Sequence, residues 1–195
     1  GFYIGRYETG DLSEEEAVVK KMNTNINNQT WYTMYEKCKN LSGEKENIET
    51  GMIWGSLWDE TLQWLLESGA QIQDGENGTR TITEADINTD SKNWGNYSNA
   101  TFEYTNTSGG TSTKNATLRT RIPTGSAEYT KANNIYDLAG NVYDMTLEAF
   151  HTNYRTIRGG YYGLAGSSNP AKLRTTIDPT SNSNFSGCRS ALYIK

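Results

Sequence analysis

The most informative part of this 195-residue sequence reads Asn133-Asn134-Ile135-Tyr136-Asp137-Leu138-Ala139-Gly140-Asn141-Val142-Tyr143-Asp144-Met145-Thr146. Two later stretches belong with it: Arg155-Thr156-Ile157-Arg158-Gly159-Gly160-Tyr161-Tyr162 and Gly187-Cys188-Arg189-Ser190-Ala191-Leu192-Tyr193-Ile194. Each combines short apolar or aromatic runs with Gly, Asn or Asp, residues that favour turns. The pattern predicts short strands punctuated by turns.

Two helices are predicted upstream of these strands. The first follows a Thr30 cap and ends before Gly43, and the second runs from Ser56 to Ser68 and ends before Gly69. Each carries an apolar stripe at three- and four-residue steps, which is typical of a helix packed on a core. The stripes consist of Trp31, Met34, Tyr35, Cys38 and Leu41 in the first helix and Trp58, Leu62, Leu65 and Leu66 in the second.

The whole chain, residues 1–195, is predicted to form one domain. Phe2 to Tyr7 alternates like a strand, and Ser13 with Glu16 has capping-box spacing that predicts a short helix. Residues 74–117 are rich in Asn, Thr, Ser and Gly without an apolar period, which predicts a long polar excursion. The bulk of the core is expected from Trp31, Trp54, Trp58 and Trp64.

Composition excludes several classes of protein. Leu, Ile, Val and Phe make up only about 16% of residues, a range typical of disorder, but 13 Tyr and 5 Trp can form a core. The net charge of -5 without a basic cluster argues against nucleic-acid binding, and no apolar run is long enough to span a membrane. His151 is the single histidine, which disfavours a Ser-His-Asp triad or a multi-histidine metal site.

Together, the three stretches resemble the formylglycine-generating-enzyme-like, or sulfatase-modifying-factor, family. Its hallmarks are a D-L-x-G-N-V-W-E-W turn, an R-G-G strand and a terminal G-F-R strand, which match Asp137 to Met145, Arg158 to Gly160 and Gly187 to Arg189. The resemblance implies an α+β, C-type-lectin-like fold. We expect two main helices, small antiparallel sheets and long irregular loops.

The sequence departs from the enzymes of this family at their copper-binding cysteines. Those enzymes carry two cysteines shortly after R-G-G, where this chain has Leu164 and Asn169. Neither side chain can supply the thiolate that copper chemistry needs. Cys188 replaces the aromatic residue of G-F-R, so Cys38 and Cys188 are poor substitutes. The sequence therefore predicts a protein that is not an enzyme.

The same motifs resemble a second group, the variable proteins diversified by retroelements, which display hypervariable residues on a lectin-like scaffold. The resemblance implies a variable, ligand-displaying region at 143–189, with Tyr154, Tyr161, Tyr162 and Phe185 as rigid aromatic anchors. It implies a receptor or adhesin of a bacterial cell surface or phage virion that binds a protein or carbohydrate, with no nucleic acid and no membrane insertion. The predicted binding residues are Phe150, His151, Tyr154, Tyr162, Leu164, Lys172, Leu173, Thr175, Thr176 and Ile177.

No cofactor is required by this interpretation, but two further features follow from the resemblance. Asp137, Gly140, Val142 and Asp144 match calcium-binding positions of the family, and the alternative is a hydrogen-bonded structural turn. C-type-lectin relatives join the helix and strand that carry Cys38 and Cys188 by a disulfide, and the alternative is two buried thiols.

Two other functions remain open from the sequence alone. One is an oxidase-type enzyme, formylglycine-generating or related and dependent on a metal. The other is a structural domain of a larger surface or phage tail protein.

Overall fold

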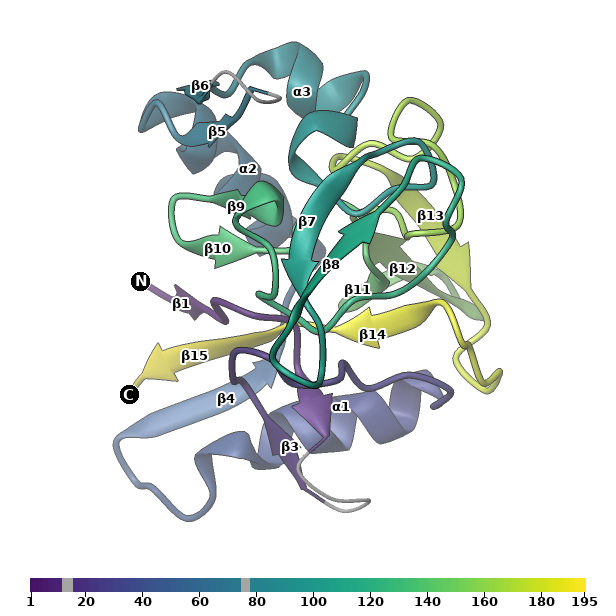
Figure 1. The fold of residues 1–195 in the computed structure, drawn as a ribbon. Coiled ribbons are helices and arrows are strands. Elements are labelled where there is room, and N and C mark those ends of the chain that lie inside the picture. The colour runs from purple at the N-terminus through teal and green to yellow at the C-terminus, as the bar shows by residue number, and fades with distance from the viewer. Residues whose placement is uncertain (12–15, 75–77) are drawn as a thin grey trace.

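A computed structural model describes residues 1–11, 16–74 and 78–195. Both ends of the chain lie at one small antiparallel sheet, in which the C-terminal strand is central and the strand order is β1-β15-β4 (Figure 1). These strands are β1 (Tyr3–Ile4), β15 (Ser190–Ile194) and β4 (Ile48–Met52). The predicted N-terminal strand therefore exists, but it pairs over two residues.

A second sheet has the strand order β13-β12-β11-β14 and carries most of the predicted display region. Its strands are β11 (Tyr143–His151), β12 (Tyr154–Arg158), β13 (Arg174–Ile177) and β14 (Ser186–Cys188). β11, β12 and β13 pair antiparallel, whereas β14 pairs parallel to β11. The expectation of antiparallel sheets is therefore wrong for this one pair, because the loop after β13 returns the chain along β11 in the same direction.

Helices α1 (Trp31–Lys39) and α2 (Gly55–Glu67) match the two predicted helices closely. The Thr30 side chain accepts a hydrogen bond from the Thr33 amide at 3.2 Å and caps α1 as predicted. Gly69 follows α2 with a φ of +64°, a conformation that glycine adopts without strain. α1 is followed by the short helix η1 (Asn40–Ser42).

The core consists of two apolar clusters, one on each helix. The cluster on α1 packs Trp31, Met34 and Cys38 against Met145 and Ile157 of the second sheet. The larger cluster on α2 contains Trp58, Leu62, Leu65, Trp94 and Tyr97. The prediction for the tryptophans is correct for Trp31 and Trp58 and wrong for Trp54 and Trp64, which are about half exposed.

The predicted polar excursion, 74–117, contains regular structure and part of the core. Trp94 and Tyr97 lie fully buried within it, although neither belongs to an apolar period that sequence could reveal. β6 (Thr79–Thr81) pairs with β5 (Gln71–Gln73), which lies just before the segment, and β7 (Phe102–Thr105) with β8 (Thr111–Lys114) forms a second hairpin. Between them lie α3 (Glu84–Asn88) and η2 (Lys92–Trp94).

The remaining elements are short. They are β2 (Gly10–Asp11), β3 (Ala17–Val18), η3 (Glu128–Thr130), β9 (Lys131–Ala132) and β10 (Ile135–Tyr136). Ala17 and Val18, expected in a short helix, form a strand instead, while Ser13 of the predicted capping box lies outside the described residues. No helix among the described residues is both long and apolar enough to cross a membrane.

Candidate functional site: an aromatic surface on the second sheet

The turn between β10 and β11 fixes where the display region begins. Asn141 is its hub: its side-chain oxygen accepts from the Asn96 side chain at 3.0 Å and the Ile122 amide at 3.1 Å, and its amide donates to Glu8 at 2.7 Å. A Cβ on Gly140 would lie 2.3 Å from the Asn96 carbonyl oxygen, so only glycine fits there. The predicted tight turn is therefore an interlocked structural element.

Four charged groups are buried beneath this turn. Glu8, Asp137, Asp144 and Arg189 are at most 1% exposed, and Arg189 Nε lies 3.5 Å from Asp144 Oδ2. One oxygen of Asp137 accepts from the Thr124 hydroxyl at 2.9 Å and the Gly125 amide at 2.8 Å. Burial raises the pKa of Asp144 to about 6 and raises the pKa values of Asp137 and Glu8 as well.

The arrangement does not fit the calcium site implied by the family resemblance. The cation facing Asp144 is the Arg189 guanidinium, so a divalent ion held there would be repelled. The Val142 amide points at the cluster and donates to Glu8 at 3.3 Å, so an N–H dipole adds to the positive charge of the guanidinium there. In the described part of the chain no three carboxylate, thiol or imidazole side chains come together as metal ligands.

We expect the free energy of unfolding to increase as the pH falls from 7.5 to 5. The folded-state pKa values of Glu8, Asp137 and Asp144 are raised, so the folded protein binds protons in a range where the unfolded chain has released them. This stabilisation is complete below the ordinary carboxyl range near about 4 and is lost as the pH rises through about 6 for Asp144.

Urea unfolding across this range, with EDTA in every buffer, measures the pH effect. The carboxyls with lowered pKa values, Asp86, Glu128 and Asp178, stay ionised in the folded protein across this window and oppose the trend only slightly, near pH 5. Asp144→Asn is the matched variant and should flatten the slope. A stability that is constant or decreases between pH 7.5 and 5 would contradict the expectation.

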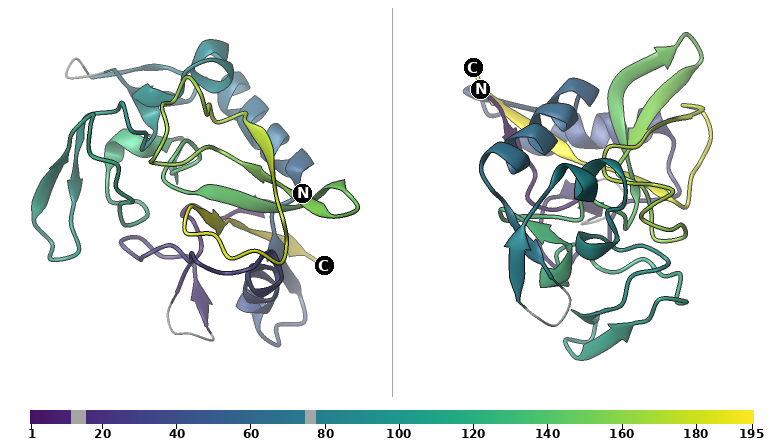
Figure 2. Two further views of the ribbon diagram at one scale, coloured as in Figure 1. Left: turned by 90° about the vertical axis from the view of Figure 1, so that its right-hand side faces the viewer. Right: turned by 90° about the horizontal axis from the view of Figure 1, so that it is seen from above.

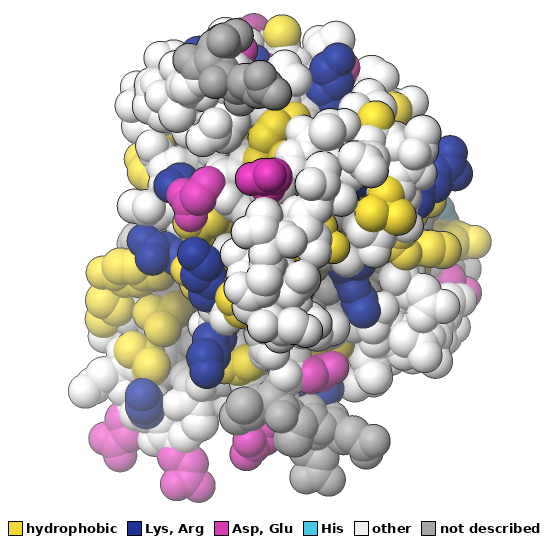
Figure 3. Space-filling model, viewed as in Figure 1, with side chains coloured by type: hydrophobic (Ala, Val, Ile, Leu, Met, Phe, Trp, Pro, Cys, Tyr) yellow, Lys and Arg dark blue, Asp and Glu magenta, His cyan; other side chains and the backbone are white. Residues whose placement is uncertain are grey.

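The β11–β12 hairpin ends in three exposed aromatic side chains. The His151 ring lies 5.5 Å from the Phe150 ring and 5.0 Å from the Tyr154 ring, edge to face with the latter. Phe150 is 47% exposed and Tyr154 39% exposed. The hairpin extends beyond the body of the molecule (Figure 2), and apolar side chains gather at the corresponding right-hand edge of Figure 3. These three predicted residues form one surface, which we call the hairpin tip.

Arginine side chains tie the hairpin tip to the body. The Arg155 guanidinium lies 4.8 Å from the Trp31 ring of α1, and the Arg174 guanidinium lies 5.6 Å from the Phe150 ring. Arg174 of β13 also pairs with Glu148 of β11. The exposed Phe150 ring is thus held in place without being buried, which suits a recognition surface.

A second aromatic group lies at the other end of β11. The Tyr161 ring contacts the Tyr143 ring at 4.9 Å, the Phe185 ring at 5.1 Å and the Tyr162 ring at 5.5 Å. Gly160 places this group after β12: its φ is +78°, and a Cβ there would lie 2.3 Å from the Asn169 carbonyl oxygen. Leu164, 38% exposed, follows on the same loop.

The other predicted binding residues do not join either aromatic group. Lys172 lines a charged groove with Asp59, Glu60 and Glu84, and Leu173 is half-buried beside it. On β13, Ile177 pairs with Arg155 and packs on the α1 cluster, whereas Thr176 pairs with Thr156 on the opposite face. Thr175 shares the α1 face with Ile157. The predicted residues are therefore divided among the hairpin tip, the second aromatic group, the charged groove and the two faces of β13, where successive residues of the strand face opposite ways.

Sequence reasoning missed four residues that shape these surfaces. They are Trp31, Tyr143, Arg155 and Arg174. For the two arginines the sequence offers a weak signal, because Arg155 follows the predicted aromatic residue Tyr154 and Arg174 begins a strand. The sequence does not show which aromatic ring each guanidinium contacts, since Trp31 and Phe150 lie on other elements.

Both cysteines are buried thiols in this structure. Their sulfur atoms lie 3.2 Å apart, with Cys38 on α1 and Cys188 on β14 as predicted. The two cysteines that the resemblance pairs therefore lie next to each other, and the disulfide itself stays a prediction.

Leu164 and Asn169 stand where the family resemblance implies the copper-binding cysteines of the enzymes, and neither side chain has a thiol. Leu164 is an exposed apolar side chain, and Asn169 is buried and accepts a hydrogen bond from the Tyr143 hydroxyl. Leu164 therefore contributes to the exposed surface of the loop, and Asn169 holds the Tyr143 ring of the second aromatic group.

Comparison with known proteins places the fold. The chain superposes on Treponema denticola variable protein 1 with a TM-score of 0.53 and 17% identity, covering 97% of this chain and 84% of that one. It superposes on PvdO from Pseudomonas aeruginosa with a TM-score of 0.58 and 14% identity, covering 99% of this chain and 80% of that one. No curated protein sequence matches it.

These likenesses confirm the predicted C-type-lectin-like fold. The model of the sulfatase-modifying factor enzyme 1-like domain matches residues 61–194, which is more than half of the chain and includes all three diagnostic stretches. The chain therefore belongs to the sulfatase-modifying factor enzyme 1-like domain family.

Proposed function

We propose that this chain is a non-catalytic ligand-binding protein of the retroelement-diversified kind, a receptor or adhesin of a bacterial surface or phage virion. The observation that carries the proposal is the hairpin tip. Phe150, His151 and Tyr154 are large and exposed, and none of them belongs to either core cluster. Aromatic side chains of this kind supply most of the binding energy in protein recognition surfaces.

Two further observations support the proposal. The structure is similar in fold to a solved protein that is named as variable, Treponema denticola variable protein 1. The residues at the family's copper-binding positions, Leu164 and Asn169, cannot supply thiolate, which argues against the family's oxidation chemistry. The partner that suits an aromatic and polar surface of this size is a protein or a carbohydrate on another cell or particle.

Randomising exposed residues of the predicted binding set, which lie on the hairpin tip, the loop 160–171 and the charged groove, should leave the fold intact. Surface substitutions usually change the free energy of unfolding by less than about 0.5 kcal/mol, whereas truncations in the core cost about 2–5 kcal/mol. A yeast-displayed library would vary Phe150, His151, Tyr154, Leu164 and Lys172. A matched library would vary Trp31, Met34, Met145, Ile157 and Ala191, which are buried.

We expect most members of the first library, and few of the second, to survive a heat challenge and still be displayed. Selection of the first library against hen egg-white lysozyme should then yield binders of micromolar affinity. Equal loss of folded display from both libraries would contradict a tolerant display surface.

The diversification itself is tested in the encoding DNA. A near-copy of the codons for residues 143–189, differing at adenines and lying beside a reverse transcriptase gene, is the expected finding. If the genome lacks such a near-copy, the proposed diversification is wrong. The display libraries then decide separately whether the protein binds ligands.

A further inference from the structure

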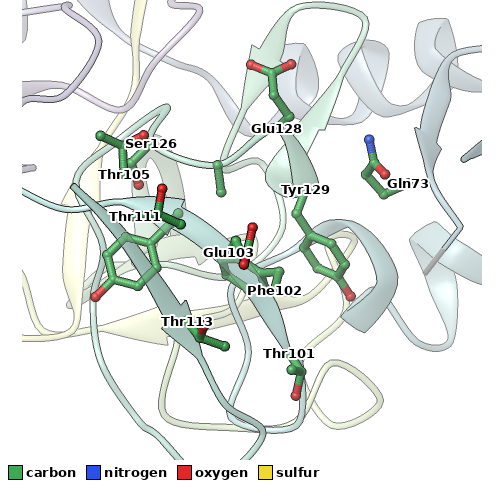
Figure 4. A pocket seen from close by; sticks show the side chains of 12 residues that line it. Gln73, Thr101, Phe102, Glu103, Thr105, Thr111, Thr113, Ser126, Glu128 and Tyr129 are labelled. Atoms are coloured by element: carbon green, nitrogen blue, oxygen red, sulfur yellow. The ribbon is translucent and has the colours of Figure 1, made fainter. Parts of the chain in front are cut away.

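We propose that the β7–β8 hairpin forms a second binding site, separate from the display surface, that takes a neutral saccharide without a metal ion. The site is a groove of about 880 Å³ between this hairpin and the segment Ser126 to Tyr129, with Gln73 at its edge (Figure 4). Its hairpin lies in the segment that the sequence presents as a polar excursion, and none of its lining residues belongs to the predicted display region 143–189, so the display function does not account for it.

The lining of the groove is rich in hydroxyl groups and contains aromatic rings. Five of its residues carry an aliphatic hydroxyl: Thr101, Thr105, Thr111, Thr113 and Ser126. Figure 4 shows Thr105, Thr111 and Ser126 on one side of Glu103 and Thr101 and Thr113 on the other. The Phe102 and Tyr129 rings stack at 4.5 Å and form an apolar wall. Hydroxyls, a carboxylate and an aromatic face are the chemistry that a sugar ring needs, since one face of it is apolar and its edges carry hydroxyls.

One polar atom in the groove lacks a partner. The Ser126 hydroxyl is buried, with the residue 7% exposed, and accepts or donates no hydrogen bond among the described residues. A buried hydroxyl without a hydrogen bond costs free energy, so a ligand hydroxyl that reached it would gain more than a surface contact. By contrast, the Tyr129 hydroxyl already donates to the Lys92 carbonyl at 2.7 Å, and this bond fixes the ring as a wall.

The groove disfavours the other common ligands. Among the described residues, its lining includes Glu103 and Glu128 but no Lys or Arg, which disfavours anions such as phosphates or acidic glycans. Strand addition by a peptide is blocked at β7, which pairs with β8 on one edge while the Thr105 amide donates to the Ser126 carbonyl at 2.9 Å on the other. With anions and strand-forming peptides disfavoured, the ligand that suits the groove is a neutral polyhydroxylated molecule recognised by side chains.

An array of neutral and acidic glycans, with hits confirmed by isothermal titration calorimetry in EDTA, tests the proposal. We expect a neutral glycan to bind, and Thr113→Val and Ser126→Ala each to weaken binding by roughly threefold to tenfold, the effect of one hydrogen bond. Thr117→Val, an exposed threonine of the same excursion outside the groove, is the matched control and should have no effect.

The display variant Tyr154→Ala separates this proposal from the proposed function. Saccharide binding that Tyr154→Ala leaves intact and the groove variants weaken would support the groove. Binding lost in Tyr154→Ala and kept in the groove variants would place the sugar on the display surface and overturn the groove. Absence of any neutral glycan among the hits, or a preference for acidic glycans, would also overturn it.

Discussion

Arg189→Ala should lower the free energy of unfolding by about 3–5 kcal/mol, the cost of leaving buried charge uncompensated. The guanidinium is fully buried and donates to the Gly5 and Tyr136 carbonyls, each at 2.8 Å. Its Nε lies 3.5 Å from Asp144 Oδ2, and its charge also lowers the pKa values of Glu8 and Asp137 against the effect of burial. Removing it leaves three buried carboxyls without a cation.

The charge origin of this effect can be separated from lost packing. Adding Asp144→Asn to Arg189→Ala should recover part of the loss, because the double variant no longer contains the unpaired carboxylate. The penalty of Arg189→Ala should also be smaller at pH 5 than at pH 7.5, since the pKa of Asp144 is about 6 in the native protein and rises further without the guanidinium.

Urea unfolding monitored by tryptophan fluorescence measures these changes. Arg119→Ala, at an exposed arginine, is the control and should stay within about 0.5 kcal/mol of the parent. A loss below about 1 kcal/mol for Arg189→Ala, or no recovery in the double variant, would show that Arg189 does not hold the cluster.

This cluster also marks what the sequence could and could not reveal. Local signals were sufficient for the helices, because a cap such as Thr30 and a stop such as Gly69 act within a few residues. The sequence Gly187-Cys188-Arg189 can be recognised as the family's terminal motif. That its arginine meets Glu8 and Asp137 depends on segments more than 50 residues away, and no spacing in the sequence encodes that meeting.

The sequence points to 143–189 as the display region, which stays a prediction, but it does not show how the residues of that region are assembled. Phe150, His151 and Tyr154 are exposed there, yet which residues share a face depends on the β11–β12 register. That register shifts between Met145 and Ala149 and again before His151, so simple alternation fails at the hairpin tip. Trp94 and Tyr97 were missed for a related reason: each is a single aromatic anchor in a polar segment, and periodicity cannot detect an isolated buried ring.

The second large effect is expected at Trp58, which connects the core to the display loop. Its ring is fully buried on α2, and its indole N–H donates to the Ala171 carbonyl at 3.1 Å. The ring also packs so closely on Gly159 that a Cβ there would lie 3.1 Å from it. Trp58 therefore holds both ends of the loop 160–171, which carries Tyr162 and Leu164.

Trp58→Ala should lower the free energy of unfolding by about 3–5 kcal/mol, because the cavity and the lost indole hydrogen bond add to the lost burial. Amide hydrogen exchange should accelerate over residues 160–171 more than in α1, since α1 packs on the other apolar cluster. Trp64→Ala, on the same helix but 46% exposed, is the matched control and should cost less than about 1 kcal/mol. Equal losses for the two variants, or unchanged exchange in the loop, would mean that the display loop is held without Trp58. The expected outcome would mean that Trp58 holds the backbone of loop 160–171 in place. The exposed residues of that loop could then change without loss of the loop's conformation.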